Sequence, residues 1–238
     1  MLYLMSYVLV DKPKTWTSHD VVGYLRKVLK IKKIGHAGTL DPFATGLLIV
    51  GVGRESTKRL DEFKNLLKTY IATLQLGAIS DTGDSTGVIT NLPQPLLTKE
   101  GHALSPPTKG ELEGVLDSFI GEQDQIPPMY SAKKIEGKKL YELARKGIEI
   151  ERKPNKINIY EIKLLEYSYP QLKIEVICSA GTYIRTLAQD IGAALDVGAY
   201  CDELERTKIG DYSIKDGVNP KKISKENYED FILKETGF

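Results

Sequence analysis

The segment HAGTLDPFATG, residues 36–46, constrains the fold of this chain more than any other stretch. Gly38 and Gly46 lie on either side of Asp41, and Pro42 fixes the backbone directly after it. The apolar run LLIV follows at once and predicts a short buried strand. We therefore expect the carboxylate of Asp41 in a loop whose direction is set by the backbone, beside a hydrophobic core.

Composition indicates a globular protein with a substantial core. The chain has 238 residues, 41% of them hydrophobic, which suffices for one large domain or two small ones. Cys178 and Cys201 fit no redox or metal-binding spacing, as expected for reduced thiols in the cytoplasm. The opening MLYLMSYVLV lacks the basic start of a secretory signal and predicts a first strand. No apolar run is long enough to span a membrane, so we expect a cytoplasmic protein without membrane contact.

Hydrophobic periodicity predicts a mixture of strands and helices. Three residues are expected to cap amphipathic helices: Ser18, Thr108 and Thr182. Strands are expected in YIATLQLG and near residues 156–167 and 171–178. Because strands and helices do not alternate strictly, we expect an α+β fold built on a largely antiparallel sheet.

Positive charge is concentrated in two segments. The net charge of the whole chain is +1, but residues 12–33 carry +6 and residues 133–156 carry +5. Tyr130 precedes the second segment and Tyr141 lies within it, and cations interleaved with rings suit a surface that follows RNA phosphates and stacks on bases. Lysines on solvated faces explain the charge equally well.

Arg185 is expected in the first turn of the helix after CSAGTY, where the helix dipole disfavours a cation by up to about 1 kcal/mol. A nearby anion should compensate, and a surface pair with Asp190 or a glutamate is the simpler interpretation. If the anion is Asp41, an attraction on the order of 4 kcal/mol at about 4 Å would keep a desolvated carboxylate ionised. Such a carboxylate can act as a nucleophile.

GDSTG at 83–87 has the spacing of a hydrolase nucleophile elbow, but prolines follow where a helix would have to begin. We expect a hairpin in which Asp81 and Asp84 make local turn hydrogen bonds. The same acids lack the remaining ligands of a calcium loop, and HAGTLD lacks the lysine of a phosphate-binding loop. These patterns therefore indicate structure and not chemistry.

Five motifs in order resemble the TruB-type tRNA pseudouridine synthases: VDKP, GHAGTLDPFATGLLIVGVGREST, KTYIATLQLG, PPMYSAKKIEGKKLYELARKG and CSAGTYIRTLAQDIG. The resemblance implies the pseudouridine synthase fold, with a central mixed, largely antiparallel sheet flanked by helices and a basic RNA-clasping insertion near 122–153. It also implies an isomerase that flips out the uridine at tRNA position 55, in the T-loop, and converts it to pseudouridine without metal or cofactor.

The resemblance further implies roles for single residues. Asp41 matches the nucleophile, Tyr70 the ring that lies on the uracil and is implicated in proton transfer at C5, and Arg185 the partner of the nucleophile. His36 matches the side chain that fills the place of the flipped base, and Lys12 the lysine of the D-K-P motif. The remaining matches are residues that line the base pocket or bind RNA: Tyr183, Leu204, Tyr130, Lys133, Lys138 and Lys139.

These residue types suit the reaction. The N1–C1′ bond must break, the uracil must turn and C5 must join the ribose, so a carboxylate adduct can hold the intermediate while a base removes the C5 proton. Attack at C6, attack at C1′ and elimination through a glycal all fit. Extruding the base costs a few kcal/mol, which phosphate contacts and a filler side chain can offset.

The sequence departs from the family pattern at Glu205, where relatives often have arginine, so we expect a weaker RNA contact there. Asp196 stands where glycine is common. After Gly210 too few residues remain for the C-terminal PUA-type domain of many relatives. We therefore expect a single catalytic domain over residues 1–238, acting as a monomer.

Three hypotheses remain open. The favoured one is a standalone enzyme whose partner is the T-arm of tRNA. A guide-RNA-dependent synthase of the dyskerin type would carry the PUA domain and lack the MYSAKK clasp, so no guide RNA is expected. A non-catalytic tRNA folding factor would not need Asp41, Tyr70 and Arg185 together.

Overall fold

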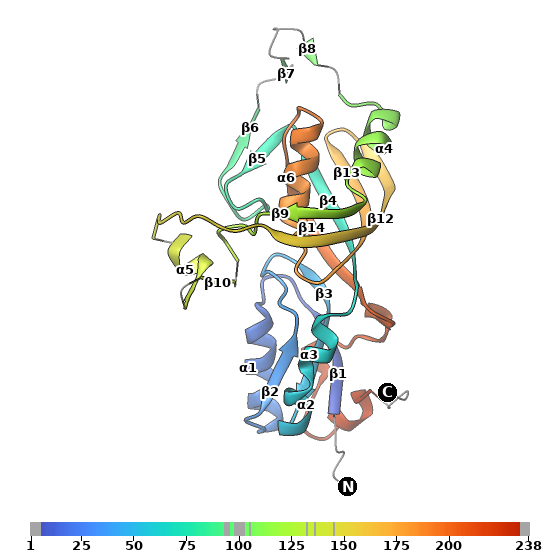
Figure 1. Cartoon of the computed structure of the whole chain (residues 1–238). Coiled ribbons are helices and arrows are strands. Elements are labelled where there is room, and N and C mark those ends of the chain that lie inside the picture. Colours follow the sequence, from blue (N-terminus) through green and yellow to red (C-terminus); the bar gives the residue numbers. More distant parts are fainter. Residues whose placement is uncertain are drawn as a thin grey trace. The chain divides into compact units, whose positions relative to one another are not determined.

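The chain forms two compact units in the computed structural model (Figure 1). Unit 1 comprises Met1–Tyr70 and Glu205–Phe238, and unit 2 comprises Ile71–Leu204. The structure describes residues 6–92, 96–97, 103–104, 106–131, 133–135, 137–144 and 146–233. Strands β4 (Lys68–Leu76) and β14 (Ala199–Ile209) each begin in one unit and end in the other. The single catalytic domain with an insertion at 122–153 stays a prediction.

Unit 1 is organised around strand β3. Its elements are β1 (Ser6–Lys12), α1 (Ser18–Leu29), β2 (Ile34–Ala37), β3 (Thr45–Val52), α2 (Arg54–Lys58), α3 (Leu60–Lys64), β15 (Tyr212–Ser213) and the 3-10 helices η1 (Ile214–Asp216), η2 (Pro220–Lys222) and η3 (Tyr228–Phe231). β1 pairs antiparallel with one edge of β3. The other edge is shared: β2 pairs antiparallel with residues 49–52, and β14 pairs parallel with residues 45–46.

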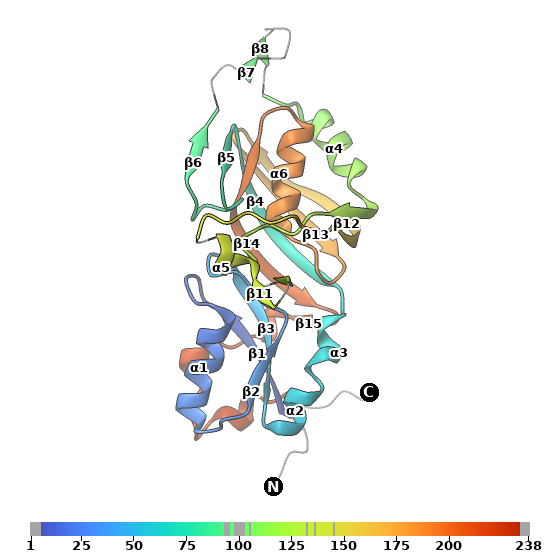
Figure 2. The ribbon, with the colours of Figure 1, turned by 60° about the vertical axis from the view of Figure 1, so that its left-hand side comes forward.

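β3 is buried on both faces because helices cover each of them. Leu48 and Val50 pack with the apolar stripe of α1, whereas Leu47 and Ile49 pack with α3. Figure 2 shows α1 and α3 on opposite sides of β2 and β3. This two-sided burial explains why LLIV is a continuous apolar run and not an alternating one.

Thr17, and not Ser18, caps α1. The Thr17 hydroxyl accepts from the Asp20 backbone N–H (3.0 Å), and the Asp20 carboxylate accepts from the Thr17 N–H (2.7 Å). The expectation for Ser18 was wrong by one residue because Asp20 completes a capping box only with Thr17. Ser18 is buried, and its hydroxyl bonds to the backbone of Leu40 instead.

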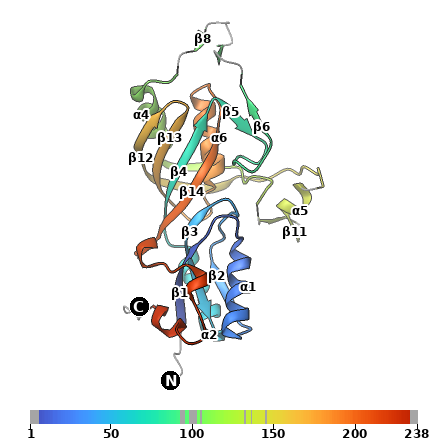
Figure 3. The same ribbon diagram turned by 180° about the vertical axis from the view of Figure 1, so that it is seen from behind.

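Unit 2 holds the remaining elements: β5 (Ala78–Ser80), β6 (Ile89–Asn91), β7 (Leu96–Leu97), β8 (Ala103–Leu104), α4 (Lys109–Ser118), β9 (Gly121–Gln125), β10 (Lys134–Ile135), β11 (Lys138–Lys139), α5 (Leu140–Ala144), β12 (Asn155–Ser168), β13 (Gln171–Cys178) and α6 (Ile184–Ala194). Its strands follow the order β4, β13, β12, β9, and Figure 3 shows β4, β13 and β12 from the side that α6 does not cover. β12 is antiparallel to both its neighbours. The predicted α+β fold on a largely antiparallel sheet is confirmed.

The predicted strands near 156–167 and 171–178 are confirmed as β12 and β13, and Thr108 caps α4 as expected. The expectation for Thr182 was wrong: Tyr183 is the N-cap of α6, and the Thr182 hydroxyl donates to the Ser179 carbonyl (3.0 Å). Gln125 fixes the cap from outside the helix. Its amide oxygen accepts from the Tyr183 N–H (2.7 Å), and its amide nitrogen donates to the Tyr183 carbonyl (3.0 Å).

Among the described residues, no helix is long and apolar enough to cross a membrane.

Candidate active site

The loop between β2 and β3 carries Asp41 and is fixed along its length. The hydroxyl of Ser18 accepts from the Leu40 N–H (2.9 Å), which ties the loop to the first turn of α1. The Pro42 carbonyl accepts from the Thr15 N–H (2.8 Å). Asp41 is half-buried between these two anchors. Its backbone direction is therefore set as the sequence predicts.

Arg206 of β14 is a third anchor of this loop. The side chain is 1% exposed; its Nη2 donates to the Gly38 carbonyl (3.1 Å) and its Nε to the Leu47 carbonyl (2.8 Å). Gly46 packs directly on the Arg206 backbone: with φ +104°, a Cβ there would lie 2.4 Å from the Arg206 carbonyl oxygen, so only glycine fits. Sequence reasoning missed this role because no local pattern marks contacts to residues so far along the chain.

Lys12, at the end of β1, is fully buried. Its Nζ donates to the carbonyls of Pro13 (3.0 Å) and Trp16 (2.6 Å). Burial lowers the pKa of Lys12 to about 8, although the charge of Asp41 opposes that shift. The same attraction favours the ionised form of the Asp41 carboxylate. A direct role for Lys12 in binding substrate stays a prediction.

His36, in β2, has an uncharged ring at neutral pH. Burial, together with the nearby positive charges of His19, Arg206 and Lys64, lowers the pKa of His36 to about 4. The ring packs edge-on against His19, with centroids 5.3 Å apart. Its Nδ1 is buried and has no hydrogen-bond partner among the described residues. A flat, neutral ring of this kind is suited to stacking.

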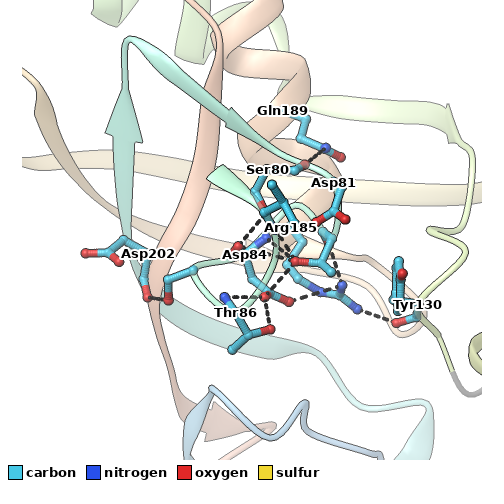
Figure 4. A network of polar contacts seen from close by, with 11 residues as sticks. Ser80, Asp81, Asp84, Thr86, Tyr130, Arg185, Gln189 and Asp202 are labelled. Carbon is cyan, nitrogen blue, oxygen red and sulfur yellow. Dashed lines mark hydrogen bonds and ion pairs between the residues drawn. The ribbon is translucent and has the colours of Figure 1, made fainter. Parts of the chain in front are cut away.

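Arg185, in the first turn of α6, lies in a buried polar network of unit 2 (Figure 4). Its Nη1 lies 3.3 Å from Oδ2 of Asp84 and donates to the Thr82 carbonyl (2.7 Å), and its Nη2 donates to the Tyr130 carbonyl (2.7 Å). The Arg185 side chain is 3% exposed and that of Asp84 is 6% exposed, which excludes a pair at the surface. A compensating anion was expected, and Asp84 supplies one. Because Asp41 belongs to unit 1, its pairing with Arg185 stays a prediction.

Asp84 lies in the turn between β5 and β6. Its Oδ1 accepts from the Thr82 hydroxyl (2.9 Å) and from the Thr86 N–H (2.9 Å), while Asp81 accepts from the Val88 N–H (2.8 Å). The predicted hairpin and its local turn bonds are confirmed. The sequence did not predict the ion pair between Asp84 and Arg185. The one sign of it in the sequence was an acidic residue within a rigid turn.

The other predicted residues are distributed over both units. Tyr70 in β4 and Leu204 in β14 are buried. The Nζ of Lys133 donates to the side chain of the first residue of β12 (2.6 Å). Lys138 and Lys139 form β11, but their side chains lie outside the described part of the structure. Among the described residues, no group of three His, Cys, Asp or Glu side chains is arranged to hold a metal ion.

Comparison with known proteins gives consistent matches. Residues 26–184 match the model of the TruB family pseudouridylate synthase, N terminal domain. The tRNA pseudouridine synthase B of Clostridium tetani is 49% identical over 224 residues, which cover 94% of this chain and 74% of that protein. The enzyme of the same name from Parabacteroides distasonis is 49% identical, with coverage of 90% and 89%.

A solved Cbf5-Nop10-Gar1 complex contains a chain that matches with a TM-score of 0.66 and 27% identity, over 90% of this chain and 52% of that one. This chain thus spans about half of the solved one. Together the matches define the class of protein: a pseudouridine synthase, which is an isomerase, with the fold of that class. The chain belongs to the TruB family of pseudouridylate synthases, as the motifs predicted.

Proposed function

We propose that this chain converts the uridine at position 55, in the T-loop of tRNA, to pseudouridine. The observation that carries the proposal is the Asp41 loop, which Ser18 and Arg206 hold in place while the buried ammonium of Lys12 attracts the carboxylate. A carboxylate that is fixed in direction and kept ionised is suited to covalent catalysis. Relatives at 49% identity bear the name tRNA pseudouridine synthase B, which supports tRNA as the substrate.

In this proposal Asp41 adds covalently to the extruded nucleotide. The N1–C1′ bond breaks, the uracil turns, and C5 bonds to C1′; the bond to Asp41 then breaks and the free carboxylate is restored, while C5 loses its proton and N1 gains one. Tyr70 takes part in transfer of the C5 proton, and Arg185 is the cation that accompanies the nucleophile. Substrate and product contain the same atoms, so the reaction needs no external donor or acceptor.

RNA recognition is assigned to residues around this chemistry. His36 fills the place that the flipped base leaves, which its neutral ring supports. Tyr183 and Leu204 line the base pocket, and Gln125 holds the backbone of Tyr183 on both its polar groups. The segment 122–153 clasps the T-loop through the RNA-binding residues predicted within it: Tyr130, Lys133, Lys138 and Lys139.

The test uses the protein alone with an unmodified tRNA transcript and maps pseudouridine at each position, without guide RNA. Asp41→Asn preserves size but removes the charge, so we expect no product and a tRNA affinity within a few-fold of wild type. Asp211→Asn, an exposed acid in the β14–β15 turn, is the matched control and should leave turnover unchanged. Turnover by Asp41→Asn would exclude Asp41 as the nucleophile.

A guide-RNA-dependent synthase is the second candidate, because a solved "H/ACA RNP bound to a substrate RNA" also matches, with a TM-score of 0.63. The identity of that match is 25%, against 49% for the two tRNA enzymes named above, which favours the standalone reaction. Product that forms only when guide RNA is added would reverse this preference. A non-catalytic folding factor would be favoured if the wild-type protein forms no product and the Asp41→Asn variant still promotes tRNA folding.

A further inference from the structure

The exposed face of α1 carries most of the positive charge of the basic segment 12–33, and the proposed function assigns no residue of this face. Five cations lie at its C-terminal end and in the turn that follows, here called the α1 cationic cluster: Arg26, Lys27, Lys30, Lys32 and Lys33. All five are exposed, and in the described part of the chain none of them forms an ion pair. Asp20, the acid of this helix, is occupied in the N-terminal capping box. The cluster therefore faces solvent with its charge uncompensated.

The cluster lies on the same helix as the anchor of the Asp41 loop but at the opposite end. Ser18, the first residue of α1, bonds to that loop. At a rise of about 1.5 Å per residue, Arg26 lies about 12 Å and Lys30 about 18 Å further along the axis. The Nη2 of Arg26 also donates to the Ile34 carbonyl (2.6 Å), which holds the turn after the helix against this end.

Two residues of this face are poor choices for a helix. Gly23 lies in the middle of α1, exposed, and a Cβ there would meet no atom within 4 Å, so packing does not require glycine. Lys30 ends the helix with φ +56°, in the left-handed conformation where glycine is the usual residue. Gly23 therefore leaves the centre of this face without a side chain. Lys30 places a cation where a glycine would stabilise the end of the helix. Departures from local preference of this kind are expected at functional surfaces.

Helix electrostatics explains only part of the cluster. Arg26 and Lys27 lie in the last turn of α1, where cations complement the helix dipole. Lys32 and Lys33 follow the helix, beyond the last turn where that effect acts. The helix dipole therefore does not account for the charge of Lys32 and Lys33.

We propose that the exposed face of α1, from Gly23 to the α1 cationic cluster, binds the phosphate backbone of the tRNA at nucleotides away from the uridine that reacts. This inference rests on the proposed function, because it takes tRNA as the substrate. The cations match the charge of the phosphates, and Gly23 lets the RNA backbone approach the helix closely. Each phosphate neutralised adds about 0.7 to 0.9 to the slope of log affinity against log salt.

The experiment measures binding of an unmodified tRNA transcript to the full chain between 50 and 200 mM KCl. The test variant replaces three cluster lysines with glutamine: Lys27→Gln, Lys30→Gln and Lys32→Gln. The matched control removes three exposed lysines elsewhere in unit 1: Lys208→Gln, Lys215→Gln and Lys225→Gln. We expect the test variant to lower the slope by about 2 and to weaken binding at least about tenfold at 100 mM KCl, with the control close to wild type. Equal slopes in the two triple variants would overturn the proposal.

Gly23→Gln gives an independent readout. Glutamine is a better helix former than glycine, so the melting temperature should rise, whereas tRNA binding should weaken about fivefold because the side chain blocks close approach. Unchanged binding by a stabilised Gly23→Gln would refute the close approach. Binding is measured separately from turnover. If the wild-type protein forms no pseudouridine, the proposed function is refuted. The salt slopes still show whether the exposed face of α1 binds tRNA.

Discussion

Acid should destabilise this protein in a pH window that His36 defines. The pKa of His36 is about 4 in the folded chain, against an ordinary value of 6.5, because the ring is buried. Between these values the unfolded chain binds a proton that the folded chain does not, so the free energy of unfolding falls as the pH falls. The whole shift corresponds to about 3 kcal/mol at about 1.36 kcal/mol per pH unit, and about 2 kcal/mol of it is lost between pH 7.5 and 5.

The perturbation is His36→Gln, which removes the titrating ring and keeps a polar side chain of similar reach. Urea unfolding at pH 7.5 and pH 5 gives the free energy of unfolding of both proteins. Wild type should lose about 2 kcal/mol more than the variant on acidification. NMR of the histidine rings checks the cause directly, since the chain has three histidines and the variant assigns the His36 signal. Equal losses in the two proteins, or a His36 signal that titrates near 6.5, would refute the reasoning.

Three further outcomes follow from the contacts. Asp84→Asn leaves the buried guanidinium of Arg185 without this carboxylate and should lower the free energy of unfolding by about 3 kcal/mol in urea; an unchanged value would mean that the pair does not stabilise the fold. Arg206→Met keeps the bulk but loses the hydrogen bonds to the Gly38 carbonyl of the loop and the Leu47 carbonyl of β3, so stability should fall by about 3 kcal/mol and pseudouridine formation should slow. Arg206→Lys should restore part of both, and full activity of Arg206→Met would contradict the anchoring role. Gly192→Ala places a Cβ 2.2 Å from the backbone nitrogen of the first residue of β14 and should destabilise the fold by about 2 kcal/mol. Gly114→Ala, in open space on α4, should stabilise the fold by up to about 1 kcal/mol. Thermal unfolding should therefore show a lower melting temperature for the first variant and a higher one for the second.

Features that depend on near neighbours in the chain could be predicted from the sequence. The position of Asp41 in a loop bounded by glycines, the strands β12 and β13, the cap at Thr108 and the turn bonds of Asp84 all depend on residues a few positions apart or on a period of two. The family itself was recognisable because its motifs are contiguous. Caps were misjudged at Ser18, where the neighbouring Thr17 forms the capping box with Asp20, and at Thr182, where Gln125 from β9 holds the backbone of Tyr183.

The basic segment 12–33 shows most clearly what could not be predicted from the sequence. Residues 12–33 form one basic segment in the sequence, yet Lys12 is fully buried beside the Asp41 loop while Lys32 and Lys33 are exposed. A count of charges cannot separate these cases, because burial depends on which distant segments cover a side chain. Local sequence was enough to identify the family and to predict that Asp41 lies in a loop bounded by glycines. Only the tertiary structure decided which cations support that loop and which face solvent, since those contacts join residues far apart along the chain.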